Sequence, residues 1–89
     1  MRTTDSQTGM AGELSLAALR VGARARVIAV KGSGAVARRL MEMGVVPGAR
    51  VRVIKAAPLG DPIEVRVRGY HLALRRAEAQ SITVVMSDE

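Results

Sequence analysis

Alternating apolar and polar residues along short stretches of the chain predict strands. Residues 24–28 (RARVI) and 50–54 (RVRVI) place apolar side chains on one face and arginines on the other. The same alternation covers residues 63–67 (IEVRV), and short apolar stretches follow at residues 71–74 and 82–85. About five short strands, rich in valine and other β-branched residues, indicate a mainly β chain folded as a small, partly open barrel.

A phrase of seven residues occurs twice, as GARARVI at residues 22–28 and as GARVRVI at residues 48–54, and the copies agree at six positions. Each copy begins with a glycine, Gly22 or Gly48, where a turn needs a permissive backbone. Pro47 before Gly48 fits the two central positions of a type II turn. No third copy follows at the same spacing, which excludes a solenoid. The phrase is interpreted as one structural device used twice, a turn that starts a strand.

The one convincing helix is predicted between the two copies, with Ser33 as its N-terminal cap. An apolar stripe, expected to pack against the sheet, consists of Val36, Leu40 and Met43. Gly44 is expected to end the helix in the left-handed conformation, with Val45 folding back on Leu40 in a Schellman motif. About one further helical turn is predicted at residues 75–80 (RRAEAQ).

The segment APLGD at residues 57–61 is predicted to be the hairpin loop between the second and third strands. Pro58 and Gly60 supply its turn, and Pro62 opens the next strand, where a missing N–H donor is tolerated. Gly69 bends the chain after that strand. The polar, glycine-punctuated residues 1–12 are expected to form a flexible tail ahead of one small folded domain at residues 13–89.

The composition excludes most enzyme and metal chemistry. There is no cysteine, which excludes disulfides, zinc ribbons and thiol catalysis. No motif surrounds the single histidine, His71, that would make it the base of a nucleophilic triad. The carboxylates are scattered along the chain rather than clustered as metal ligands. The chain is therefore predicted to be no enzyme, to carry no cofactor and to hold no metal ion tightly.

The charge balance is basic, with 14 lysines and arginines against 8 acidic residues and a formal net charge of +6. Such a balance suits nucleic acid, an anionic membrane or an acidic protein partner. Six arginines are expected to coat one face of the sheet: Arg24, Arg26, Arg50, Arg52, Arg66 and Arg68. Because single-strand binders interleave such charge with stacking aromatics, and Tyr70 is the only aromatic residue, this face is interpreted as solvated. Non-specific binding of RNA or DNA stays the alternative function.

The chain offers no apolar stretch of membrane-spanning length, and Arg20 interrupts any signal-peptide core. A cytoplasmic location is therefore expected. A rigid small barrel with an ordered loop and no reactive groups fits an interaction or regulatory module, and self-association stays open.

Several ordered motifs resemble those of the FeoA family, small cytoplasmic accessory proteins of bacterial ferrous iron uptake. The motifs are LxxLxxG at residues 16–22, RRLMEMGVVPG at 38–48, APLGDPIE at 57–64 and GYxLALRRxEA at 69–79, followed by ITV. Together they cover about residues 13 to 86, nearly the whole predicted domain.

The resemblance implies an SH3-like β-barrel with an inserted helix. It also implies a partner, the membrane permease FeoB, whose cytoplasmic N-terminal part is a GTP-hydrolysing domain. A loose association with transition-metal ions belongs to the family as well, although the scattered ligands of this chain support it poorly. The basic surface suits a position beside an anionic inner leaflet.

Mapped onto this sequence, most matching positions are architectural. The turn and core residues are Gly22, Leu40, Gly44, Pro47, Gly48, Pro58, Gly60, Pro62 and Gly69. The candidates for contact with the permease are Leu59 and Asp61 in the hairpin loop, Arg38 and Arg39 on the helix, and Arg75 and Arg76 after the last bend. Asp61 has an alternative role, because an Asp before Pro commonly fixes its own loop. Leu59 has the alternative of folding back to plug one end of the barrel.

Overall fold

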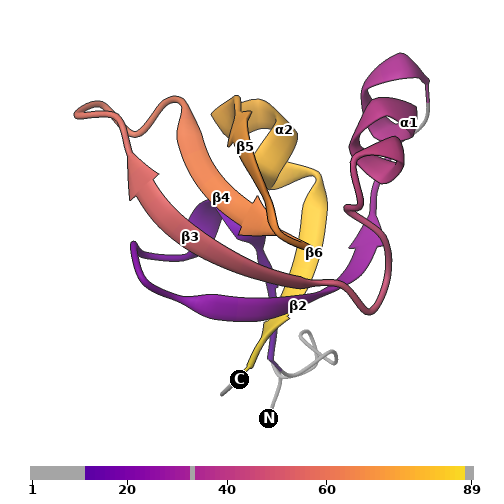
Figure 1. Ribbon diagram of the computed structural model, residues 1–89, viewed down its shortest axis with the longest axis horizontal. Helices are drawn as coiled ribbons and strands as arrows, with labels where there is room; N and C mark the ends of the chain where they lie inside the picture. Colours follow the sequence, from indigo (N-terminus) through magenta and orange to yellow (C-terminus); the bar gives the residue numbers. More distant parts are fainter. Residues whose placement is uncertain (1–11, 33, 88–89) are drawn as a thin grey trace, which may run out of the picture.

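A computed structural model describes residues 12–32 and 34–87. Six strands form one antiparallel sheet in the order β1-β6-β2-β3-β4-β5 (Figure 1). The strands are β1 (Glu13–Ser15), β2 (Arg24–Val30), β3 (Arg50–Ala56), β4 (Ile63–Val67), β5 (Tyr70–Leu74) and β6 (Ile82–Met86). The helices are the 3-10 turn η2 (Leu16–Ala18), α1 (Ala35–Glu42) and α2 (Arg76–Gln80). The predicted mainly β fold with an inserted helix and a short C-terminal helical turn is confirmed, and the short β1 brings the strands to six.

The tail predicted at residues 1–12 lies, apart from Gly12, outside the described residues. The boundary between tail and domain therefore stays a prediction.

The two copies of the repeated phrase pair with each other. They run antiparallel, so that the fourth residue of the first copy faces the fourth residue of the second. The N–H of Gly22 donates to the carbonyl of Val53 at 2.8 Å, and the N–H of Gly48 donates to the carbonyl of Val27 at 2.7 Å. These bonds join the first residue of each copy to the sixth residue of the other. The repeat therefore builds a two-stranded ladder with approximate twofold symmetry.

The same kind of turn precedes the strand of each copy. The turns are Arg20–Ala23 and Val46–Ala49, and in each the N–H of the fourth residue donates to the carbonyl of the first at 3.0 Å. The third residues, Gly22 and Gly48, have φ of 91° and 92°. This left-handed conformation at the third position defines a type II turn and favours glycine. The predicted type II turn at Pro47 and Gly48 is confirmed, and the Gly22 turn matches it.

Each copy also ends in an irregularity of the sheet. The pairing of β2 with β6 shifts register between Val27 and Ala29, and the pairing of β3 with β4 shifts between Val53 and Lys55. Such bulges bend a strand and increase its twist, which lets a small sheet curl towards a barrel. The phrase thus supplies a turn, a straight strand segment and a bend.

The core is aliphatic, and every buried side chain among residues 12–32 and 34–87 is apolar. Inward-facing positions of the strands supply most of it: Ala25, Val27, Val51, Val53, Ile63, Val65, Val67, Leu74, Ile82 and Val84. Full burial of one such Val, Leu or Ile side chain contributes about 1.5–3 kcal/mol. The alternation in the sequence therefore sorts the side chains as expected, with arginines left on the outer face.

The C-terminal end of α1 matches its prediction, whereas its buried face differs. The N–H of Gly44 donates to the carbonyl of Met41 at 3.1 Å and that of Val45 to the carbonyl of Leu40 at 3.0 Å, which is a Schellman motif. Leu40 is fully buried. The prediction for Val36 is wrong, because it is 47% exposed and the smaller Ala37 is buried instead.

The start of α1 and its placement also qualify the prediction. Ser33, predicted as the cap, lies outside the described residues, and the residue directly before the helix is Gly34. Figure 1 shows α1 at one side of the molecule beside α2, rather than laid across the sheet. Ala37 of α1 and Ala77 of α2 line the same shallow hollow. Val36 lines this hollow as well, but its side chain stays 47% exposed whereas Ala37 is buried.

Candidate partner-contact edge

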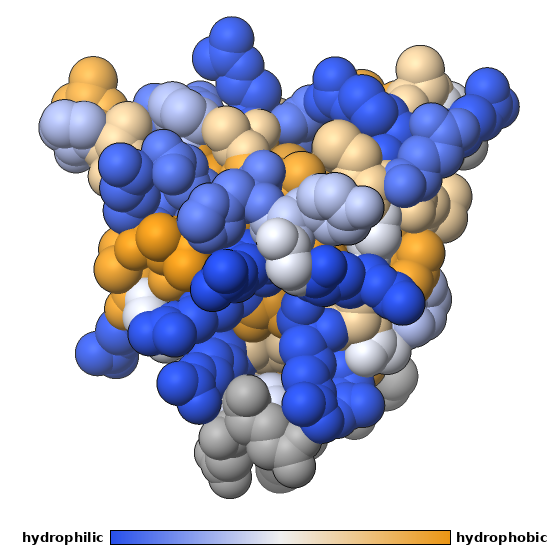
Figure 2. Space-filling model, viewed as in Figure 1, coloured by the Kyte–Doolittle hydropathy of each residue, from blue (hydrophilic) through white to orange (hydrophobic). Residues whose placement is uncertain are grey.

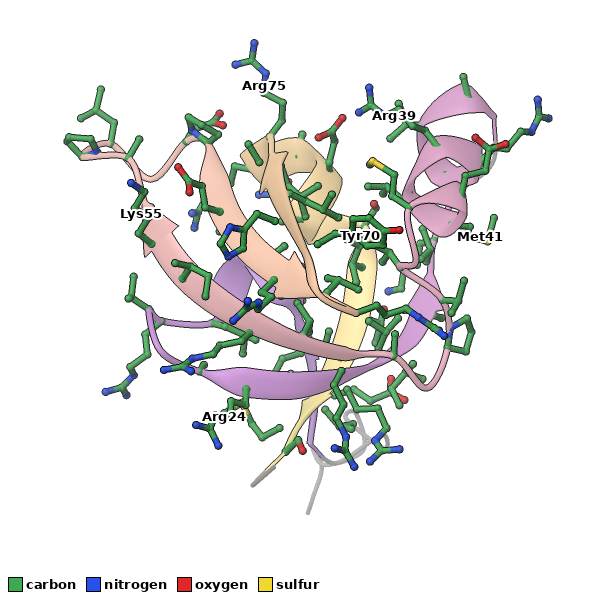
Figure 3. The ribbon with its side chains drawn as sticks, viewed as in Figure 1. Arg24, Arg39, Met41, Lys55, Tyr70 and Arg75 are labelled. Atoms are coloured by element: carbon green, nitrogen blue, oxygen red, sulfur yellow. The ribbon has the colours of Figure 1, made fainter. Side chains whose placement is uncertain are left out.

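The predicted contact residues come from three segments along one edge of the molecule. The β3–β4 loop, α2 and α1 all lie at the top of Figures 1 and 3. We call this the loop–helix edge, and its residues are Leu59, Asp61, Arg38, Arg39, Arg75 and Arg76. All six are exposed.

The β3–β4 loop presents Leu59 to solvent. The N–H of Gly60 donates to the carbonyl of Ala57 at 2.7 Å, and the N–H of Ala57 donates to the carbonyl of Pro62 at 3.0 Å, which closes the loop. Leu59 stands inside this turn with 95% of its surface exposed. The alternative in which Leu59 plugs the barrel is therefore wrong.

Asp61 fixes the loop to another element. Its Oδ1 accepts a hydrogen bond of 3.1 Å from the backbone N–H of Arg76, the first residue of α2. N–H groups in the first turn of a helix lack intrahelical acceptors, and a carboxylate placed there is favoured. A Cβ atom at Gly60 would lie 3.4 Å from Nη1 of Arg76, so the guanidinium also lies against the loop. The alternative role of Asp61, fixing its own loop, is replaced by a bond from loop to helix.

Glu78 joins the two helices and is a residue that the sequence reasoning missed. Its Oε1 accepts from the backbone N–H of Arg75 at 2.9 Å, and its Oε2 accepts from Nη2 of Arg39 at 2.7 Å. A Glu three residues after the residue that precedes a helix is the usual position for such a bond. The spacing of Arg75 and Glu78 was therefore the signal that could have found it.

A shallow hollow of about 520 Å³ lies on this edge, and it is lined by Arg39, Pro62, Ala73, Arg75 and Glu78. The structure thus brings Arg39 and Arg75 together around one carboxylate. Leu59 and Arg38 are exposed on the flanking loop and helix and do not line the hollow. The edge has the form of a contact surface with a projecting apolar side chain, rather than an enclosed site.

Within residues 12–32 and 34–87, no three His, Cys, Asp or Glu side chains gather in a way that could hold a metal ion. His71 is exposed on β5, opposite Arg66 of β4. None of the helices in the described part of the chain combines the length and apolar character needed to cross a membrane.

Comparison with known proteins places these features in a family. The pattern of the FeoA domain matches residues 14–86. A protein of Porphyromonas gingivalis that fuses Fe(2+) transport protein A to the Fe(2+) transporter FeoB is 38% identical over 71 residues. The match covers 80% of this chain and 8% of the fusion protein, so the chain corresponds to a small part of that relative.

Solved structures of similar proteins share the fold. The FeoA protein of Chlorobium tepidum is 49% identical, with a TM-score of 0.78 over 82% of this chain and 70% of that one. A FeoA of Stenotrophomonas maltophilia, solved in complex with zinc and described as a prokaryotic SH3 domain protein, is 35% identical, with a TM-score of 0.71 over 83% and 89% of the two chains. The SH3-like fold is therefore confirmed. Because the domain pattern covers most of its length, this chain belongs to the FeoA family, which is associated with ferrous iron transport.

Proposed function

We propose that the chain is an accessory module of bacterial ferrous iron uptake, which acts by binding the cytoplasmic part of a FeoB-type permease through the loop–helix edge. In this proposal Leu59 is the apolar anchor that enters a pocket of the permease. Asp61, Arg38, Arg39, Arg75 and Arg76 form the polar surroundings of the contact. The module has no catalytic step of its own.

Two observations support the choice of partner and of surface. In the fusion protein of P. gingivalis, a FeoA-like segment and a FeoB transporter share one chain, and joining two modules raises the effective concentration of one at the other. On this chain, an apolar side chain that is 95% exposed stands on a loop that hydrogen bonds brace against α2. Interface energy concentrates in such anchors when a partner buries them. The exposure of Leu59 is the observation that carries the proposal.

The test is Leu59→Glu, measured as ferrous iron uptake in cells that carry the variant and as binding of the purified protein to the cytoplasmic part of the permease. We expect both to be lost, because a carboxylate cannot be buried unpaired in an apolar pocket. The thermal unfolding midpoint should change by only about 2–4 °C, since surface substitutions change stability by about 0.5 kcal/mol or less.

Val21→Glu is the matched control, because Val21 is an apolar residue, 56% exposed, in the turn before β2. It introduces the same charge away from the loop–helix edge and should leave uptake and binding intact. Unchanged uptake with Leu59→Glu would remove the loop from the contact, and an equal loss with Val21→Glu would reduce the effect to one of charge.

A further inference from the structure

The outer face of the sheet carries a second cluster of arginines that the proposed contact does not use. Figure 2 shows hydrophilic residues gathered over β2 and β3 in the lower half of the view. We call this surface the arginine face. It consists of Arg24 and Arg26 on β2, Arg50 and Arg52 on β3, Arg66 on β4 and Arg68 in the turn that follows.

The strand register places these arginines opposite one another. Arg24 faces Arg52, and Arg52 faces Arg66 on the next strand, so three guanidinium-bearing residues form one row across the sheet. Neighbouring strands lie about 4.8 Å apart, and like charges directly opposite each other destabilise a sheet. The backbone pairing therefore keeps these positive charges close together although they repel one another. A bound anion would relieve this repulsion.

The arginines surround a hollow. Its volume is about 340 Å³, and it is lined by Arg24, Ala25, Arg50, Val51, Arg52, Arg66, Arg68, Gly69 and Ser87. None of these lining residues is acidic. Three carboxylates of the described residues are engaged elsewhere: Glu64 lies 3.8 Å from Lys55, Glu78 bonds to Arg39, and Asp61 bonds to the N–H of Arg76. The planar guanidinium group matches the oxygen spacing of phosphate, which makes phosphate-bearing groups the chemistry that this hollow fits.

Arg68 stands at the rim in an unusual backbone conformation. Together with Gly69 it forms the two-residue connection between β4 and β5, and both residues have positive φ, 53° and 86°. Asparagine or glycine is the usual choice for the first of these positions, and a larger side chain is strained there. A Cβ atom at Gly44 would lie only 3.0 Å from Cδ of Arg68, so the arginine stem lies across this glycine. Strain that places a cation at the rim of a basic hollow points to a binding role.

We propose that the arginine face docks on the phosphates of anionic phospholipids at the membrane surface. The choice of a membrane rests on the proposed function, because a transporter partner lies in one. The hollow is lined by no large exposed apolar side chain of the kind on which a protein interface depends, because Ala25 and Val51 are buried. Tyr70, the single Phe, Trp or Tyr of the chain, lines a different hollow with Glu42 and Met43. The arginines of the face are therefore not interleaved with a series of stacking aromatics of the kind that binds a nucleic-acid strand, and His71 opposite Arg66 is the one aromatic ring that the register places beside them. Electrostatic adsorption to anionic lipid needs only several nearby cations.

The position of the face agrees with a module that contacts a protein and a membrane together. Figure 3 shows Arg24 at the bottom of the molecule and Arg39 and Arg75 at the top. Lipid at the arginine face would therefore leave the loop–helix edge accessible.

The test is co-sedimentation of the full chain with vesicles of phosphatidylglycerol and phosphatidylcholine, or of phosphatidylcholine alone. We expect binding only to the anionic vesicles, falling with added salt as screening shortens the range of the charges. The variant Arg52→Gln/Arg66→Gln should reduce partitioning on the order of 10- to 30-fold, from the effect of each arginine near such a surface. The matched control is Arg38→Gln/Arg75→Gln, which removes the same net charge from the other edge and should lose less than about threefold because those charges lie farther from the lipid.

Four outcomes would overturn the proposal. These are equal loss in both double variants, equal binding to neutral vesicles, complete displacement by inorganic phosphate at matched ionic strength, and tighter binding to duplex DNA that depends on the same two arginines. The third would assign the hollow to a free anion and the fourth to nucleic acid.

A melting curve shows whether the double variant is folded, because Arg52→Gln/Arg66→Gln should unfold at the same temperature as the parent chain or higher. The vesicle measurement contains no permease, so it can fail or succeed independently of the Leu59→Glu test.

Discussion

The loop–helix edge and the arginine face are both rich in arginine, but the charges of these arginines are paired on the edge and opposed to one another on the face. On the edge, Arg39 lies against Glu78, and the backbone of Arg76 is held by Asp61. On the face, Arg52 lies between two other arginines. Ion pairs and hydrogen bonds to carboxylates stabilise the edge. On the face, the pairing of the strands opposes the repulsion between the arginines. A count of arginines therefore says little about this molecule, because the partner of each guanidinium decides whether it stabilises the fold.

The two regions also differ in how the chain assembles them. Most of the arginine face lies on β2 and β3, which contain the two copies of the repeated phrase. The hydrogen bonds between these strands set the register, and the register determines which arginines lie opposite one another. The edge needs a loop, α1 and α2, which are joined by single contacts from Asp61 and Glu78. We therefore expect single substitutions of the residues that join the segments of the edge to lower the stability of the fold, and single substitutions of arginines on the face to leave it unchanged. Four predictions test this difference.

The largest effect is expected from Leu40→Ala, which breaks the support beneath one end of the edge. Leu40 is fully buried and belongs to the core cluster, and removing such a side chain costs about 2–5 kcal/mol. This is a large share of the stability of a small domain. Chemical denaturation would measure it. A loss below about 0.5 kcal/mol, the range of surface substitutions, would mean that α1 is only loosely attached.

Glu78→Ala should cost about 1–2 kcal/mol, because it removes both a bond to the start of α2 and the ion pair with Arg39. Glu78→Gln is the control that keeps an oxygen acceptor for the N–H of Arg75. It should cost less than about 1 kcal/mol, the usual worth of a partly exposed ion pair. Equal losses in the two variants would assign the whole effect to the ion pair with Arg39.

Arg52→Gln should have a small effect of the opposite sign. It removes two like-charge neighbours, Arg24 and Arg66, so stability should stay level or rise by up to about 0.5 kcal/mol. The gain should shrink as salt screens the parent chain. A clear loss of stability at every salt concentration would show that the face is stabilised by contacts of Arg52 and not burdened by its charge.

The smallest effect is expected from metal ions, since neither region gathers three suitable ligands among the described residues. Added Fe²⁺ or Zn²⁺ should shift the melting temperature by no more than about 1 °C, because only ligands that bind the folded state stabilise it. Elemental analysis after dialysis should find far less than one metal ion per chain. Near-stoichiometric metal would contradict the prediction and require ligands beyond those described.

Much of the local structure followed from the sequence. Alternation predicted which strand residues are buried, the type II turn followed from Pro47 and Gly48, and the Schellman motif followed from Gly44. These features depend on the conformational preferences of neighbouring residues, so a short stretch of chain contains the information. The repeated phrase predicted its own turn and strand for the same reason.

The tertiary structure decided which of these pieces meet. The sequence did not show that the two phrases pair with each other, that Ala37 rather than Val36 is buried, or that Glu78 connects α1 to α2. Each outcome depends on what lies opposite a side chain. The partner is 24 to 28 residues away along the chain for the two paired copies and 39 residues away for Arg39 and Glu78. The periodicity of the sequence indicates on which side of a strand or helix a residue lies, but not which residue packs against it. The opposing roles of Arg39 and Arg52 arise from that neighbour, because the sign of an electrostatic interaction is a property of the pair.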